Sequence, residues 1–429
     1  MRSLILAMAL VLVGGCSKPP DHRTVIHISS WGDIQENTIL QGLITKFEKD
    51  NPGIHVALDR VPYEEYVDKL LTQFAGDLAP DIIFVSAENL ADFYPRGLLE
   101  PLTPYVRKDP AFDLKGFYPE LVKWYTVDGD LYVVPRDIAP VCVIYYNKKA
   151  FDGAGLAYPK DDWTVDEFMK DAQALTERDK NGNVLRWGFA DDWALPEAWI
   201  YAFGGGFVDD THHPTRYRVN EPGFVRGVQF RGDLINKYKV MPSPSSLAQQ
   251  GSVGASDLFA NGTAGMFLSG IWKTPLFRGI KDFGWDVAMF PHPKGMKGRV
   301  VGGSSGYGIV SSSKHKQEAW RFIAYLSGPE GQARFASTGL AQPALKKVAE
   351  SSAFLDGKDP LNKKMLLKAV PLGVDQPMAV NWREVMQSII FPRLDRVWLG
   401  KEKAVQAVAA LNEELKKHPP VPMKAKNNP

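Results

Sequence analysis

The spacing of apolar residues in the first hundred positions alternates between strand and helix patterns. β-Branched residues at 24–30 indicate a strand, and apolar side chains then recur on one helical face from Ile39 to Phe47. The following segments are predicted as a strand at 54–58, a helix at 64–76 and a short buried strand at 81–85. Strand–helix repeats of this length predict a parallel sheet in an α/β fold.

The carboxyl ends of these strands carry polar and aromatic residues. The two ends are Ser30-Trp31-Gly32-Asp33 and Ser86-Ala87-Glu88-Asn89. Ligands of parallel α/β sheets bind at this edge, so Trp31, Asp33, Glu88 and Asn89 are candidate ligand contacts. Asn89 has a second interpretation, because asparagine at this place can cap the following helix.

Local signals predict the later elements. Asp128-Gly129 indicates a tight hairpin, and Thr164 with Glu167 forms a helix-capping box. The remaining expectations are a strand at 141–146 with Cys142 in the core, an amphipathic helix at 314–326, a last helix at about 402–416 and a frayed tail at 418–429.

The first residues are typical of an export signal. Arg2 precedes an apolar run at 4–13, which is too short to cross a membrane. Val13-Gly14-Gly15-Cys16 resembles the bacterial lipobox, in which the thiol is lipidated and the chain is cut before the cysteine. We therefore expect a signal peptide at 1–15, a tether at 16–23 and an exported protein that Cys16 anchors to a membrane, facing the periplasm or the cell exterior. The alternative is an ordinary secretory signal with an incidental cysteine.

Composition narrows the functional classes. The 429 residues suit two large lobes, and 45% hydrophobic with 23% charged residues is ordinary for a globular protein. A net charge of +2 gives no general electrostatic reason to bind nucleic acid. Two cysteines exclude a disulfide framework and a cysteine-rich metal site. The Asp179–Asn183 segment is predicted as a polar hairpin, not a calcium loop, and His212-His213 as a solvated loop, so neither a metal nor a cofactor is expected.

Ordered sequence fragments carry a family resemblance. The fragments are Ile26–Trp31, Phe47–Val56, Phe74–Ile83, Gly97–Leu102, Asp130–Pro135, Ile144–Lys148, Trp163–Phe168, Phe259–Met266, Gly270–Trp272 and Gly302-Gly303 before Ala319–Phe322. In this order, behind a lipobox, they resemble the extracellular solute-binding proteins of ABC importers, in the maltose-binding-protein-like sugar group.

The resemblance implies two discontinuous α/β lobes joined by a hinge, with the ligand in the interlobe cleft. By analogy, lobe one holds 24–138 and 296–345, and lobe two holds 145–290 and 355–429. The crossings are expected near 137–146, 290–297 and 345–356. The implied partners are a small carbohydrate and the importer permease, for a monomer without catalytic residues that meets the membrane only through its lipid.

A sugar presents hydroxyls at its rim and apolar faces, so its site needs flat aromatics and polar side chains. The aromatic candidates are Trp31, Trp193, Trp272 and Trp382, of which Trp31 and Trp272 are favoured by family position. Arg136 and Asp137 follow Pro135 at the first crossing and either contact the ligand or pair with each other. Further candidates are Glu36, Asp191, Arg383 and, in a glycine-rich cleft loop, Gly303, Ser304 and Tyr307.

Two other functions stay open. A secreted carbohydrate-active enzyme with paired carboxylates is one, because Asp and Glu are plentiful. A binding protein for a non-sugar solute, such as a glycerol phosphodiester, a polyamine or a metal, is the other. A strongly cationic cleft would favour a phosphorylated ligand.

Overall fold

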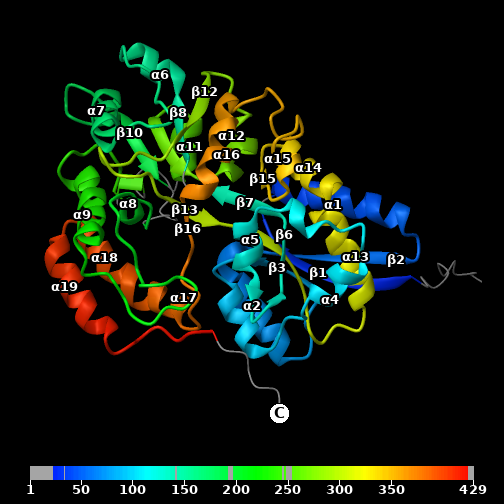
Figure 1. The fold of residues 1–429 in the computed structure, drawn as a ribbon. Helices are drawn as coiled ribbons and strands as arrows, with labels where there is room; N and C mark the ends of the chain where they lie inside the picture. The colour runs from blue at the N-terminus through cyan, green and yellow to red at the C-terminus, as the bar shows by residue number, and fades with distance from the viewer. Residues whose placement is uncertain are drawn as a thin grey trace, which may run out of the picture.

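Two five-stranded sheets and a smaller sheet between them organise the chain (Figure 1). The computed structural model describes residues 23–32, 34–140, 143–191, 197–243, 246–247 and 254–423. The predicted signal peptide, Cys16 and Cys142 lie outside these residues. No helix in the described ranges is long and apolar enough to cross a membrane.

The first sheet has the strand order β2-β1-β3-β14-β6. Its strands are β1 Thr24–Trp31, β2 Ile54–Val61, β3 Ile82–Ser86, β14 Ser305–Ile309 and β6 Val134–Pro135. β1 pairs in parallel with β2 and with β3, which confirms the parallel sheet predicted from the strand–helix spacing. β14 enters antiparallel between β3 and β6, although it comes much later in the chain.

Helices cover the first sheet on both faces and at its edges. They are α1 Ile34–Asp50, α2 Tyr63–Ala75, α3 Leu90–Phe93, α4 Thr103–Lys108, α5 Pro119–Trp124, α13 Lys316–Ser327, α14 Pro329–Ser337 and α15 Lys346–Ala349. In α1, Ile39, Leu43 and Phe47 are buried, as their spacing on one helical face predicted. The hairpin at Asp128-Gly129 joins β4 Thr126–Val127 to β5 Asp130–Leu131.

The second sheet has the order β12-β8-β11-β10-β9. Its strands are β8 Val143–Asn147, β9 Glu177–Arg178, β10 Val184–Asp191, β11 Ala264–Ser269 and β12 Trp285–Met289. Its helices are α6 Lys148–Gly153, α7 Val165–Leu175, α8 Glu197–Ala202, α9 Pro222–Asn236, α11 Ala255–Ala260, η3 Ile271–Lys273 and α12 Thr274–Phe277. The carboxy-terminal part adds α16 Lys364–Ala369, α17 Trp382–Val385, the π-turn Met386–Ile390, α18 Phe391–Trp398 and α19 Ala404–Leu415.

A third sheet, β15-β7-β13-β16, lies between the lobes in Figure 1. It collects β7 Asp137–Pro140, β13 Val300–Gly303, β15 Gln342–Pro343 and β16 Gly373–Val374. On its two sides are separate hydrophobic cores. One core draws mainly on 26–138 and 307–348, and the other mainly on 143–301 and 354–415. The lobe boundaries given above stay a prediction.

Two local expectations can be judged directly. The capping box is confirmed, because Thr164 Oγ1 accepts from the Glu167 amide and the Glu167 carboxylate accepts from the Thr164 amide. The frayed tail is wrong for residues up to 423. Asn381 Nδ2 donates to the Pro419 carbonyl and its Oδ1 accepts from the Val421 amide, so side-chain hydrogen bonds fix this segment beside α17.

A buried ion pair stands inside the second lobe. The guanidinium of Arg231 on α9 donates to both carboxylate oxygens of Asp191 at 3.1 Å and stacks on Trp398, 4.3 Å from the ring centroid. The Arg231 side chain is 0% exposed and that of Asp191 is 3% exposed. Removing one partner would leave the other charge buried and uncompensated.

We predict that Asp191→Asn lowers the free energy of unfolding by about 3–5 kcal/mol, because Arg231 then loses its buried counter-ion. Urea unfolding monitored by circular dichroism measures the loss. Asp282→Asn, at an exposed site, is the matched control and should change stability by less than about 0.5 kcal/mol. Equal stability of the two variants would contradict a structural role for Asp191.

Candidate ligand-binding cleft

Two aromatic side chains line the edge of the first sheet. Trp31 is the last residue of β1, and Tyr63 begins α2 directly after β2. Their rings meet edge to face with centroids 5.4 Å apart, and Trp31 also lies 4.3 Å from Phe84. Trp31 is half-buried and Tyr63 is 48% exposed, so both rings keep apolar surface that a ligand can contact.

Glu88 joins this aromatic pair. It follows β3, and its Oε1 accepts a hydrogen bond of 2.7 Å from the Tyr63 hydroxyl. The nearby carboxylate, together with burial, raises the pKa of Tyr63 well above its usual range, so the phenol stays a donor. The neighbouring Asn89 is buried at the start of α3, where its side chain forms no cap hydrogen bond.

The second lobe contributes a buried carboxylate. Glu197 begins α8 and is 7% exposed. Its Oε1 accepts from Gln376 Nε2 at 3.2 Å, whereas its Oε2 has no hydrogen-bond partner among the described residues. Burial, and next the charge of Glu88 from the first lobe, raise the pKa of Glu197 to about 7. Two carboxyl groups, one from each lobe, therefore interact across the junction.

The cation that precedes the crossing strand β7 is fully paired. Arg136 donates to Asp137 Oδ2 from Nε and Nη2, and from Nη1 to Glu36 Oε1 at 2.5 Å. Its guanidinium lies 4.3 Å from the Phe84 ring centroid and 4.6 Å from that of Phe335. Although burial opposes the charge, the carboxylates of Asp137 and Glu36 hold the pKa of Arg136 above its usual value. Of the two predicted roles for Arg136 and Asp137, the structure shows pairing with each other.

Asp137 also fixes the glycine-rich loop between β13 and β14. Its Oδ1 accepts from the Ser305 amide, and its carbonyl accepts from Ser304 Oγ. The Ser304 carbonyl in turn accepts from the Ala87 amide, just before Glu88. Gly303 pairs with Ala139 in the third sheet. Gly303 and Ser304 therefore connect β7, the strand that leaves the first lobe, with the loop that carries Glu88.

Trp272 reaches from the second sheet toward the first lobe. It lies in η3, immediately after β11, and its half-buried ring packs against the core of the first lobe. The ring folds back over Gly270, where an added Cβ would stand 1.9 Å from a ring carbon. The glycine is needed here for close approach and not for its backbone angles.

Three candidates lie in cores instead. Tyr307 is 0% exposed beside Phe84, with ring centroids 4.9 Å apart, and Asp191 pairs with Arg231. Trp382 is 5% exposed and packs on Phe207, centroids 5.3 Å apart, in the core of the second lobe. These side chains are buried and contact other protein groups, which leaves them little surface for a ligand.

Arg383 connects the lobes away from that group. It contacts Asp92 Oδ1 at 3.3 Å and Asp68 Oδ1 at 3.0 Å, both in the first lobe. Asp33 and Trp193 lie outside the described residues, as does the whole segment 192–196 that precedes Glu197. No group of three His, Cys, Asp or Glu side chains suited to a metal occurs in the described part of the chain.

Three residues of the candidate site were not predicted from the sequence: Tyr63, Glu197 and Gln376. Tyr63 directly follows β2, so the rule for strand ends that singled out Trp31 and Glu88 could have found it. Glu197 lies between Trp193 and Trp199, a weaker signal. Nothing local distinguishes Gln376, because its role depends on a contact 179 residues away.

The sequence pattern described as bacterial extracellular solute-binding protein matches residues 31–333. The chain belongs to this family. An ABC substrate-binding protein from Listeria monocytogenes, solved in complex with cycloalternan, is 25% identical and superposes with a TM-score of 0.83, covering 92% of this chain and 99% of that one. This match confirms the two-lobed fold that the resemblance implied. Members of the family are solute-binding components of ABC transporters and not enzymes.

Two relatives of similar sequence identity to this chain are named for different ligands. The maltotriose-binding protein of Pyrococcus abyssi is 25% identical over 88% of this chain and 76% of its own. The sn-glycerol-3-phosphate-binding periplasmic protein of Salmonella paratyphi A is 23% identical over 86% of each chain. Kinship alone therefore leaves the ligand class of this solute-binding protein open, and the cleft chemistry has to decide it.

The raised pKa of Glu197 predicts a pH-dependent stability. The folded protein holds this proton up to about pH 7, whereas the unfolded chain releases it near pH 4.5, so stability falls as pH rises between these values. We expect Glu197→Gln to remove this slope and to raise the free energy of unfolding at pH 8 by on the order of 3 kcal/mol at most.

Urea unfolding between pH 4.5 and pH 8 measures the effect. Glu350→Gln, at an exposed helix end, is the control and should keep the wild-type slope. A Glu197→Gln variant that parallels the wild type across this range would contradict the buried proton.

Proposed function

We propose that this solute-binding protein binds a neutral sugar or short oligosaccharide between its lobes and delivers it to the permease of an ABC importer. The observation that carries the proposal is the buried Glu197, whose Oε2 lacks a partner among the described residues, within electrostatic reach of Glu88. A carboxylate oxygen in this position is a strong acceptor for a ligand hydroxyl.

The charge of the cleft favours this ligand class over a phosphodiester. Glu88 and Glu197 are acidic. Of the buried arginines, Arg136 already pairs with Glu36 and Asp137, and Arg231 pairs with Asp191. A phosphate would meet two carboxyl groups without an unpaired cation from the described residues, at a large electrostatic cost. Sugar hydroxyls would instead donate to the carboxylates, while the rings of Trp31 and Tyr63 cover an apolar sugar face.

The test is isothermal titration calorimetry with sugars that a thermal-shift panel selects. The panel holds mono-, di- and trisaccharides, with glycerophosphocholine and spermidine as phosphodiester and polyamine probes. A neutral saccharide should bind stoichiometrically and remain chemically unchanged after incubation. Binding of glycerophosphocholine alone would refute the sugar assignment.

Paired carboxyl groups also raise the hydrolase alternative. A glycosidase needs one protonated and one ionised carboxyl group at the scissile bond, and a Glu197 with a pKa near 7 beside Glu88 has this character. Product analysis of the same incubations decides between the two functions. Turnover that Glu197→Gln abolishes would establish the enzyme, whereas intact saccharide supports binding alone.

We predict that Trp272→Ala weakens sugar binding at least tenfold with little loss of stability. The ring is half-buried and crosses from the second sheet to the first lobe, so it suits ligand contact better than core packing. Calorimetry gives the affinity, and thermal unfolding gives the stability. Trp163→Ala is the contrasting variant, because that ring is 3% exposed and its indole donates to the Met289 carbonyl, and it should lower stability instead. Unchanged affinity with a lowered melting temperature would place Trp272 in the core.

We further propose that lipidation of Cys16 anchors the protein to a membrane. The support is the sequence Val13-Gly14-Gly15-Cys16 behind a short apolar run, since these residues lie outside the described structure.

The prediction is that Cys16→Ser moves the protein from the membrane fraction to the soluble fraction. Fractionation followed by immunoblotting checks this, with metabolic labelling by a fatty acid as a second readout. Cys142→Ser is the control and should leave the membrane fraction unchanged. A Cys16→Ser protein that remains membrane-bound would contradict the anchor.

A further inference from the structure

A second cavity lies on the other side of the segment that carries Gln376. Gln376 bonds to Glu197, but the preceding Asp375 pairs with His212 Nε2 at 2.9 Å on the cavity wall. The cavity has a volume of about 610 Å³ and is lined by none of Trp31, Tyr63, Glu88 and Glu197. It is therefore separate from the proposed sugar cleft, and its size falls in the range of small-molecule sites.

Segments from both lobes and from the third sheet enclose this cavity. Lys123 comes from α5 of the first lobe, and residues 371–375 include β16. The second lobe supplies Tyr201, the glycine turn 204–206 and the loop 207–212. Gly204 has a φ of 79°, and a Cβ on Gly205 would stand 2.6 Å from the Phe224 amide nitrogen, so this turn requires glycine.

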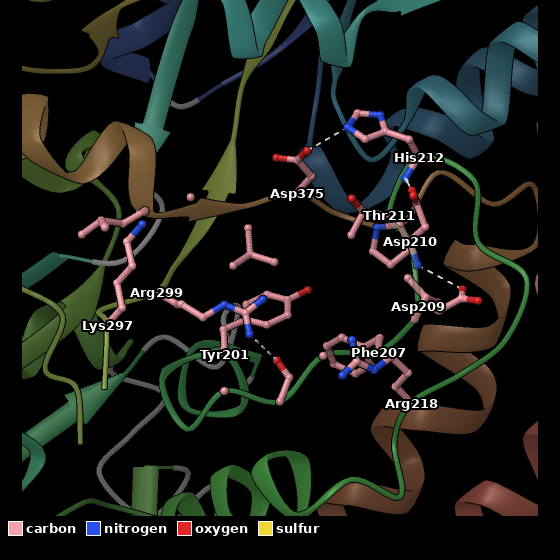
Figure 2. Close-up of a pocket in the computed structure, with 18 of the residues that line it drawn as sticks. Tyr201, Phe207, Asp209, Asp210, Thr211, His212, Arg218, Lys297, Arg299 and Asp375 are labelled. Atoms are coloured by element: carbon pink, nitrogen blue, oxygen red, sulfur yellow. Dashed lines mark hydrogen bonds and ion pairs between the residues drawn. The ribbon is translucent and has the colours of Figure 1, made fainter. Parts of the chain in front are cut away.

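Four basic and three acidic residues line the cavity, and most of the basic ones form no ion pair with a described residue. Arg218 is held by both carboxylate oxygens of Glu221. For Lys123, Lys297 and Arg299, no carboxylate of the described residues lies within ion-pair distance. The acidic residues lie opposite Lys297 and Arg299 in Figure 2, where each has donors of its own. Asp375 pairs with His212, Asp209 accepts from the Thr215 and Arg216 amides, and Asp210 accepts from the His212 and His213 amides.

Arg299 has the geometry of an anion-binding residue. Figure 2 shows it extending into the cavity beside Tyr201, with Lys297 on the same side and the acidic residues opposite. Its Nη1 donates to the Gly205 carbonyl at 3.1 Å, which orients the guanidinium, and its other donors form no hydrogen bond with a described residue. Arg299 is half-buried, and burial together with Arg218 lowers its pKa, so the charge here is costly without an anion.

We propose that this cavity is a binding site for a small phosphorylated solute, with Arg299 and Lys297 on the phosphate. Arginine matches the oxygens of a phosphate with paired donors, and lysine adds a mobile point charge. A lone phosphate would fill only a small part of 610 Å³, which is why the site suits a phosphate ester of about monosaccharide size.

The test uses glucose 6-phosphate as the probe, titrated into the full-length mature chain by calorimetry at 150 mM NaCl. We expect saturable binding with one site per chain, and at least tenfold weaker binding by Arg299→Gln. Arg226→Gln, an exposed arginine on α9 of the same lobe, is the matched control and should bind like the wild type. Lys297→Gln, at an exposed position, gives a second test that does not depend on the folding of Arg299→Gln.

Four results would overturn the proposal. The first is the absence of saturable binding at 150 mM NaCl, and the second is an equal loss of affinity in Arg226→Gln and Arg299→Gln. The third is inorganic phosphate that binds as tightly as the ester. The fourth is a loss of ester affinity in Trp31→Ala without a loss in Arg299→Gln. The last result would place the ester in the sugar cleft. Sugar binding measured on the Arg299→Gln protein keeps this site and the proposed function separately testable.

Discussion

The buried guanidinium of Arg136 is the contact on which the junction between the lobes depends. It lies between the rings of Phe84 and Phe335, and its donors hold Glu36 of α1 and Asp137 of β7. Asp137 in turn fixes the turn from β13 into β14. One charged group therefore joins the first sheet, its first helix and two crossing strands. A buried cation with three fixed donors tolerates few other arrangements, so it sets where the chain leaves the first lobe.

The same network determines the electrostatic character of the cleft. Because Glu36 and Asp137 neutralise Arg136, the remaining carboxyl groups, Glu88 and Glu197, give the cleft its polarity. On the other side of residues 375–376, Arg299 and Lys297 form no ion pair with any of the described residues. The net charge of +2 conceals this separation, since a total says nothing of how charges are distributed. The two proposed sites thus differ in character although the protein is nearly neutral.

The local sequence pattern predicted the helices, strands and turns well. It failed for residues whose role depends on a contact far along the chain. The parallel strands, the hairpin at Asp128-Gly129 and the capping box at Thr164 follow from residues within a few positions. From the sequence, Trp382 looks like a ligand-contacting residue in a loop, and Asp191 looks like one at the end of a strand. Phe207 and Arg231, which bury them, lie 175 and 40 positions away.

The candidate site shows the same division. Trp31 and Glu88 were predictable because parallel strands end at one edge of a sheet. Gln376 and the partnerless oxygen of Glu197 were not, because they exist only once the third sheet brings the two lobes together. The family resemblance supplied the two lobes, the cleft and the preference for Trp31 and Trp272, but it did not supply Tyr63, Glu197 or Gln376.

Side chains of the protein itself make contacts between the two lobes. Arg383 reaches Asp68 and Asp92, and Arg278 donates to the Ser337 carbonyl. Partly exposed ion pairs of this kind contribute at most about 1 kcal/mol each. A shift of a two-state equilibrium from 1:99 to 99:1 needs about 5.5 kcal/mol of differential binding energy. The protein contacts therefore orient the lobes without committing them. Under the proposed function, the larger share comes from a ligand that contacts both lobes at once, with Trp272 and Glu197 as its candidate contacts.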